Sequence, residues 1–367
     1  MLKSLTSFRF IAAFMVFLFH VNVLSNYQLG AAGVSFFFVL SGFIMAYTYH
    51  SKFVKLDKVT IKKYYFARFA KIYPVHILTF LISMPLVILY FHPAGLYLVK
   101  LTFMSIINLL LVQSFIPSQG TYFNFNGVSW TLSVEMFFYL TFPFLISVLM
   151  RLGVNKHIFK SLGTAFIIWI ILFTLNIKLD ENNHLHVWLL HIFPLARLFE
   201  FGIGAVLGLI FISKRDDVNI SKFVFSLLES FCVISFIGLL LLSVNLDVGA
   251  VRGGLFIPIW CMLIFTFSFQ AGIISNVLSH KFLIYLGEIS FSFYMIHQLV
   301  IRYLDFFQLE NMLKILLCFF ISLFLAAVMY QFYEEPLRKK IRFGFQRSMK
   351  GINHLSGDTA PVKKVNS

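Results

Sequence analysis

Charged residues are scarce in this sequence. Asp, Glu, Lys and Arg make up 12% of the 367 residues, whereas soluble domains carry about a quarter. An ordinary soluble enzyme is therefore excluded. Hydrophobic residues reach 59%, and a chain that spans lipid must satisfy its backbone hydrogen bonds internally. We expect an all-α, polytopic integral membrane protein.

Cysteine is also rare. The three cysteines, Cys232, Cys261 and Cys318, all lie in apolar stretches. Their positions fit neither a disulfide framework nor a zinc site. We expect them to be packing residues, and we expect neither a metal centre nor a bound cofactor.

Acidic residues are few, with 15 Asp and Glu against 30 Lys and Arg, giving a net charge of +15. Such an excess can indicate nucleic-acid binding, so its placement decides the matter. Most basic residues fall in alternate loops between the apolar stretches, and this arrangement orients a membrane protein with both termini in the cytoplasm. Nucleic acid is not needed to explain the charge. We predict ten spans: 9–25, 31–49, 73–92, 130–149, 162–178, 190–212, 224–244, 253–271, 283–303 and 312–333.

An eleventh apolar stretch, from Leu101 to Phe115, is too short to be a full span and contains Asn108 and Gln113. We expect a re-entrant or interfacial helix there. The membrane domain then covers residues 1–337. The remaining residues, 338–367, form a basic tail that we expect to be disordered and cytoplasmic.

Two ionisable residues lie on one face of the first predicted span. Arg9 and His20 are eleven residues apart, which places them ~16 Å apart along a helix and close to three full turns. Glu135 lies at a similar depth in the span 130–149, and a carboxylate there needs a partner. We expect Glu135 to pair with His20 and to stabilise its protonated ring, as general-base catalysis requires. The alternative is a buried ion pair that only fixes packing.

Arg68 and Lys71 lie at the cytoplasmic end of the third predicted span, three residues apart and so on one helix face. With Arg9 they can form a cationic mouth for phosphate groups. The alternative is ordinary anchoring by the positive-inside rule. Five further polar positions stand out inside the predicted spans: the pair Arg197 and Glu200, His297 in the outer half of its span, and the hydroxyls of Ser41 and Ser133.

Taken together, these strings resemble the membrane-bound acyltransferase family 3. The resemblance runs from Ser4 to about Arg338. Its parts are Arg9-x10-His20, Phe37-Phe-Val-Leu-Ser41-Gly42-Phe43, Arg68-x-x-Lys71-x-x-Pro74, Trp130-Thr-Leu-Ser133-Val-Glu135, Arg197-x-x-Glu200-Phe201-x-x-Gly204, Leu286-Gly287 through His297, and Tyr333-Glu334-Glu335-Pro336-Leu337-Arg338.

The resemblance implies an enzyme in the inner or plasma membrane that takes an acyl group, commonly acetyl, from cytoplasmic acyl-CoA. The acceptor would be a sugar hydroxyl of an extracytoplasmic, cell-surface carbohydrate. Arg9, Arg68 and Lys71 would bind the donor. His20 would deprotonate the acceptor or carry the acyl group, and Glu135 would assist it. Supporting polar residues would be Ser41, Trp130, Ser133, Tyr139, Arg197, Glu200 and His297, with Ser133, Tyr139 or His297 as the oxyanion donor.

Two features depart from the family pattern. Lys71 stands where relatives commonly have Arg, so bidentate phosphate binding is not expected there. Many relatives add an extracytoplasmic esterase-like domain, and we expect this chain either to acylate its acceptor directly or to rely on a separate extracytoplasmic transferase. The rival interpretation is a proton-coupled transporter or glycan export component, because intramembrane His, Glu and Arg also serve proton relays.

Overall fold

The computed structural model describes residues 2–92, 94–178, 182–246, 248–252 and 254–341. Every regular element among them is helical, and no strand occurs in these ranges. The predicted all-α fold is confirmed. The helices are α1 Lys3–His20, α2 Leu29–Tyr49, α3 Lys58–Phe91, α4 Leu96–Leu109, α5 Gln119–Tyr122, α6 Trp130–Arg151, α7 Ile158–Lys178, α8 His184–Val187, α9 Pro194–Lys214, α10 Lys222–Ser243, α11 Val248–Arg252, α12 Ile257–Ser268, α13 Ile273–Leu278, α14 Lys281–Leu304 and α15 Asn311–Met329.

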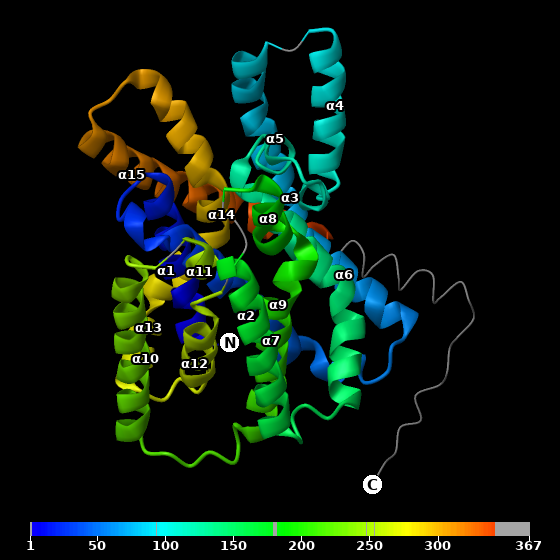
Figure 1. Cartoon of the computed structure of the whole chain (residues 1–367), viewed down its shortest axis with the longest axis vertical. Coiled ribbons are helices and arrows are strands. Elements are labelled where there is room, and N and C mark those ends of the chain that lie inside the picture. The colour runs from blue at the N-terminus through cyan, green and yellow to red at the C-terminus, as the bar shows by residue number, and fades with distance from the viewer. Residues whose placement is uncertain (1, 93, 179–181, 247, 253, 342–367) are drawn as a thin grey trace.

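In the described part of the chain, 9 helices are long and apolar enough to cross a membrane. They overlap nine of the ten predicted spans. The tenth, 253–271, differs from the prediction, because its helix α12 has only 12 residues and rises ~18 Å. Figure 1 shows α12 beside α10, whereas the short helix α11 before it contacts α7 and α2, so this part of the chain is built from two short helices.

The connections between long helices fall at two ends of the molecule. The α6–α7 and α9–α10 connections lie together at the bottom of Figure 1, and the α3–α4 and α14–α15 turns lie at the top. The sequence predicts the same alternation, since the first pair carries basic residues such as Arg151, Lys156 and Arg215. After α15 the helix continues to Ile341, so the first residues of the predicted tail are helical, and those from 342 onward lie outside the described residues.

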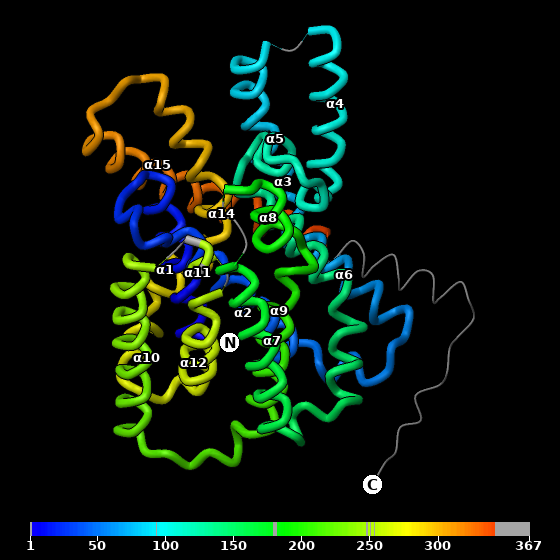
Figure 2. Tube along the Cα trace, in the orientation of Figure 1, coloured from blue at the N-terminus to red at the C-terminus, as the bar shows by residue number. Residues whose placement is uncertain are grey.

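Helix α4 covers the eleventh apolar stretch only as far as Leu109, and a separate 3-10 turn, Gln113–Phe115, ends it. With 14 residues α4 is too short for a full span, as predicted. The chain rises through α3 and comes back down through α4 in Figure 2. Phe80 and Val87 of α3 pack there against Leu101 and Met104 of α4 and against Phe125. This small cluster is separate from the main core, so α4 is an outlying helix rather than part of the central bundle.

Close contact between α2 and α9 forms the centre of the main core. A Cβ atom added at Gly204 would lie 2.0 Å from the carbonyl oxygen of Val39. Only glycine permits this separation, as the small residues of the α9 sequence predict. Few residues of helices α7, α10 and α15 are buried within the protein, which suits a lipid-facing position.

Helices α1 and α14 also approach closely. A Cβ at Gly287 of α14 would lie 1.9 Å from the carbonyl oxygen of Thr6 in α1. Further along the same pair, Phe17 packs on Phe293 with ring centroids 5.8 Å apart. These contacts run the two helices side by side and bring the outer part of α1 to α14.

Candidate functional site

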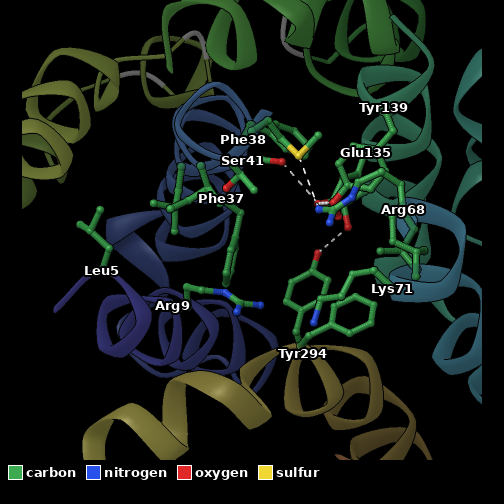
Figure 3. A pocket seen from close by; sticks show the side chains of 18 of the residues that line it. Leu5, Arg9, Phe37, Phe38, Ser41, Arg68, Lys71, Glu135, Tyr139 and Tyr294 are labelled. Atoms are coloured by element: carbon green, nitrogen blue, oxygen red, sulfur yellow. Dashed lines mark hydrogen bonds between the residues drawn. The ribbon is translucent and has the colours of Figure 1, made fainter. Parts of the chain in front are cut away.

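A cavity of about 350 Å³ lies where α1, α2, α3, α6 and α14 meet. This volume is in the range of sites that hold small molecules and cofactors. Its apolar lining includes Leu5, Phe37 and Phe38 (Figure 3). Its polar lining consists of Thr6, Arg9, Ser41, Tyr47, Thr48, Arg68, Lys71, Thr131, Glu135, Tyr139 and Tyr294.

The three predicted donor-binding cations all line this cavity. Arg9 extends into it from α1, across from Arg68 and Glu135 in Figure 3. Among the described residues Arg9 has no hydrogen bond or salt bridge to another side chain. A guanidinium that is directed into a cavity without a protein counter-ion is able to bind an anion there.

Arg68 is held by aromatic side chains rather than by a carboxylate. One of its terminal nitrogens donates to the Tyr49 hydroxyl at 2.9 Å, and the other lies 3.5 Å from the sulfur of Met45. Its guanidinium carbon also lies 5.2 Å from the centroid of Tyr49 and 5.6 Å from that of Tyr139. These contacts keep the plane of the guanidinium fixed at the wall of the cavity.

Lys71 has a counter-ion that the sequence analysis missed. Its ammonium donates to Glu334 at 2.8 Å, and Ser292 donates to the second oxygen of the same carboxylate, also at 2.8 Å. Lys71 is 21% exposed and Glu334 1%. Glu334 belongs to a π-helical turn after α15, Tyr330–Glu334. The sequence did hold a signal for Glu334, because it belongs to the last of the family strings, Tyr333 to Arg338, but no role was assigned to that string.

Glu135 lies on the cavity wall, but its partner is not His20. The Tyr139 hydroxyl donates to Glu135 at 2.5 Å, and the Ser41 hydroxyl lies 3.5 Å from the same oxygen. The expected pairing of Glu135 with His20 is therefore wrong. The prediction used only the similar depth of the two residues in the membrane, and depth does not reveal which helices are neighbours. Helix α1 packs against α14.

His20 contacts His297 instead. Nδ1 of His20 lies 3.0 Å from Nε2 of His297, which is fully buried. Neither ring lines the cavity. Tyr294, one turn before His297, does line it, and the Tyr294 and His297 rings lie 5.9 Å apart. Tyr294 also hydrogen-bonds Thr131 at 3.0 Å and packs against Phe37. Tyr294 therefore contacts both the cavity and the ring of His297.

The other predicted polar residues are divided between the cavity and the core. Ser41 and Tyr139 line the cavity, whereas Ser133 and Trp130 do not. The backbone N–H of Ser114 donates to the Ser133 hydroxyl at 3.3 Å, and the Ser114 hydroxyl donates to the Trp130 carbonyl at 2.8 Å. Ser133 and Trp130 therefore brace the entry to α6.

Arg197 and Glu200 form the ion pair that their spacing predicts, 2.8 Å apart and each 4% exposed. Arg197 also lies over the ring of Phe38, 5.2 Å from its centroid. The pair lies outside the cavity. Its visible contribution is to hold α9 against α2.

Comparison with known proteins identifies the family of this chain. A family model described as an acyltransferase domain matches residues 2–331. Acyltransferase MdmB of Streptomyces mycarofaciens is 30% identical over 82% of this chain and 79% of its own length. O-acetyltransferase OatA of Staphylococcus aureus is 25% identical over 92% of this chain, and peptidoglycan O-acetyltransferase OatA of Listeria monocytogenes is 24% identical over 98%. These matches cover only 57% and 60% of the two OatA proteins. No solved structure matches.

Proposed function

Because this chain belongs to the acyltransferase family that matches residues 2–331, we propose that it is a membrane O-acyltransferase that uses cytoplasmic acyl-CoA, with acetyl-CoA as the principal donor. The acceptor is a hydroxyl of an extracytoplasmic cell-envelope carbohydrate, and the enzyme lies in the plasma or inner membrane. Family membership favours this reading over a transporter.

The observation that carries the proposal is the cationic cavity. Arg9 points into it without a counter-ion among the described residues, and Arg68 lies across from it in Figure 3. The phosphates of CoA bind at this end, and guanidinium groups suit them because they donate several charge-assisted hydrogen bonds. Lys71 adds less positive charge to the cavity than expected, because its ammonium is paired with the carboxylate of Glu334. The pantetheine arm enters between Phe37 and Phe38, which are apolar.

The acyl group then reaches the two imidazoles beyond Tyr294. In direct transfer His20 removes the proton of the acceptor hydroxyl, the oxygen attacks the thioester carbonyl, and the C–S bond breaks. The CoA thiolate leaves and takes up the proton. In stepwise transfer the imidazole attacks first, and the acceptor hydroxyl then takes the acyl group from it. Glu135 lines the cavity, and its negative charge offsets part of the positive charge of Arg68.

Two relatives are named O-acetyltransferase and peptidoglycan O-acetyltransferase, and these names support an acetyl group and an envelope glycan as substrates. Peptidoglycan oligosaccharides are therefore the first acceptor to test. Where the acceptor is not reached directly, a separate extracytoplasmic transferase is the partner that completes transfer.

The test is acetyl transfer by the purified full chain in proteoliposomes. Acetyl-CoA labelled with ¹⁴C in the acetyl group is supplied on the side of the predicted cytoplasmic loops, with peptidoglycan oligosaccharides on the other side. We expect alkali-labile ¹⁴C ester on the sugar, and none when the two substrates exchange sides. A protein that binds no acetyl-CoA by calorimetry would overturn the donor assignment. Binding with acetyl transfer to no envelope glycan, peptidoglycan, teichoic acid or capsule, would overturn the acceptor.

A further inference from the structure

The His20–His297 contact restricts where the protons of the two rings can be. Nδ1 of His20 lies 3.0 Å from the carbonyl oxygen of Val16 and 3.0 Å from Nε2 of His297. Nδ1 of His297 lies 3.3 Å from the carbonyl oxygen of Phe293. A carbonyl oxygen only accepts hydrogen bonds, whereas a neutral imidazole has one nitrogen that donates and one that accepts.

Only one arrangement of neutral rings satisfies all three contacts. If Nδ1–H of His297 donates to Phe293, its Nε2 accepts, and Nδ1–H of His20 is then the donor shared between Val16 and His297. The opposite arrangement places a bare Nδ1 against a carbonyl oxygen on both rings. The hydrogen bond made by one ring nitrogen thus fixes the state of the other.

We propose that His297 is a positioning residue, which together with the carbonyl oxygen of Val16 holds His20 as the Nδ1–H tautomer and leaves its Nε2 as the reacting nitrogen. The proposal rests on the proposed acyltransferase function. It replaces the role of oxyanion donor expected for His297, because its Nδ1–H and its Nε2 are both used. His20 is partly exposed and has no hydrogen bond at Nε2 within the described residues, so this nitrogen is free to react.

The surroundings explain why an imidazole rather than a carboxylate orients His20. The ring of His297 is stacked on Phe293 with centroids 6.0 Å apart and lies 6.2 Å from Phe17. Phe19 lies 5.3 Å from His20. An ionised carboxylate in this aromatic setting would need a counter-ion, whereas a neutral ring accepts the hydrogen bond without introducing charge.

Both routes of acyl transfer use the same nitrogen. In direct transfer Nε2 of His20 takes the acceptor proton while oxygen attacks the carbonyl and the C–S bond breaks, and that proton then passes to the CoA thiolate. In stepwise transfer Nε2 bonds the carbonyl carbon as the thiolate leaves. In each case the ring becomes positively charged, and its Nδ1–H donates more strongly to Nε2 of His297.

Two substitutions of nearly equal size separate positioning from packing. His297→Gln places an amide oxygen near the former Nε2 and keeps an acceptor for His20. His297→Asn places its amide near the former Nδ1 and leaves Nδ1–H of His20 with only the carbonyl oxygen of Val16 as acceptor. With acetyl-CoA and peptidoglycan oligosaccharides, we expect kcat of His297→Asn to fall about 100-fold or more, since general-base groups contribute 10²–10⁴. His297→Gln should keep at least a tenth of the activity, and KM for acetyl-CoA should not move in either variant. Equal loss in both folded variants would overturn the proposal.

The tautomer of His20 can also be measured directly, without an assay of acetyl transfer. In the full chain labelled with ¹⁵N-histidine and held in lipid nanodiscs, ¹⁵N spectra distinguish a protonated from a bare ring nitrogen. His20 is one of 11 histidines and is assigned by the resonance that His20→Asn removes. We expect a protonated Nδ1 and a bare Nε2 in the parent. In His297→Asn we expect a larger share of the Nε2–H tautomer, because only the Val16 carbonyl then favours a proton on Nδ1. A bare Nδ1 in the parent would overturn the proposal. The expected spectrum in a protein that transfers no acetyl group would instead refute the proposed function alone.

Discussion

The carboxylate of Glu334 lies 2.8 Å from the ammonium of Lys71 and also accepts the Ser292 hydroxyl. The turn that follows α15 is thereby joined to the wall of the cavity. Removing one partner leaves a buried charge without a counter-ion, which is more costly than removing both. The two groups thus act as one unit.

This unit predicts non-additive effects of substitution. Lys71→Met and Glu334→Met should each lower the free energy of unfolding, and the double variant should lose less than the sum. We expect a coupling free energy of about 1–3 kcal/mol, which is typical for residues in contact. Chemical unfolding of the four proteins in detergent measures it. Additive losses would mean that the two groups do not interact in the folded protein.

Arg9 is expected to determine donor affinity. Its guanidinium enters the cavity without a counter-ion in the described chain, and a charge-assisted hydrogen bond contributes about 1.5–3 kcal/mol. Arg9→Ala should therefore raise KM for acetyl-CoA about 10–100-fold. Lys63→Ala is the control, because Lys63 is an exposed cation of α3 that does not line the cavity. A similar KM for the two variants would make Arg9 an orientation signal only.

His20→Ala should lower acetyl transfer at least ~100-fold, with unchanged membrane insertion and acetyl-CoA binding. His50→Ala is a matched control. His50 also places Nδ1 near the carbonyl oxygen four residues earlier, 3.2 Å from Ala46, but it has no second imidazole. Transfer rates of purified variants, normalised to folded protein, check the assignment. Substantial turnover by His20→Ala would remove this ring from the chemistry.

Tyr294 lines the cavity beside His297, and its ring should therefore keep water from the thioester. Tyr294→Ala should raise hydrolysis of acetyl-CoA without acceptor several-fold while acetyl transfer falls. Tyr294→Phe keeps the ring and loses only the hydrogen bond to Thr131, so hydrolysis should stay low. Release of free CoA without acceptor is the measurement. If hydrolysis does not rise in the alanine variant, another group closes this passage.

The α2–α9 contact offers a test of packing. Gly204→Ala places a methyl group 2.0 Å from the Val39 carbonyl oxygen, whereas Gly202→Ala, in the same helix, meets nothing within 4 Å. Overpacking typically costs about 1–3 kcal/mol, so Gly204→Ala should unfold at a clearly lower temperature. Gly202→Ala should unfold at or above the temperature of the parent, because alanine favours a helix. Matching unfolding temperatures would contradict the close contact.

Those features of the site that depend on composition or on spacing within one helix could be predicted from the sequence. Arg9, Arg68 and Lys71 were expected to lie together because each is near the predicted cytoplasmic end of its span. All three line the cavity. The Arg197–Glu200 pair followed from a three-residue spacing on one helix. In both cases depth or helix periodicity was sufficient.

Adjacency between helices was beyond the sequence. Glu135 and His20 share a depth, yet His20 meets His297 of α14, because glycine contacts such as Gly287 decide which helices adjoin. Glu334 was missed for the same reason, since its carboxylate reaches Lys71 across 263 residues. The 12-residue α12 was missed because hydropathy measures apolar length and not where a helix breaks.

The two imidazoles are 277 residues apart in the chain, and this separation has a consequence for synthesis. At 5–20 residues per second, roughly 14–55 s pass between translation of His20 and of His297. During that interval the first helix has no second ring for its histidine. A chain released by the ribosome before residue 297 would therefore lack the second imidazole, the end of α14 and all of α15.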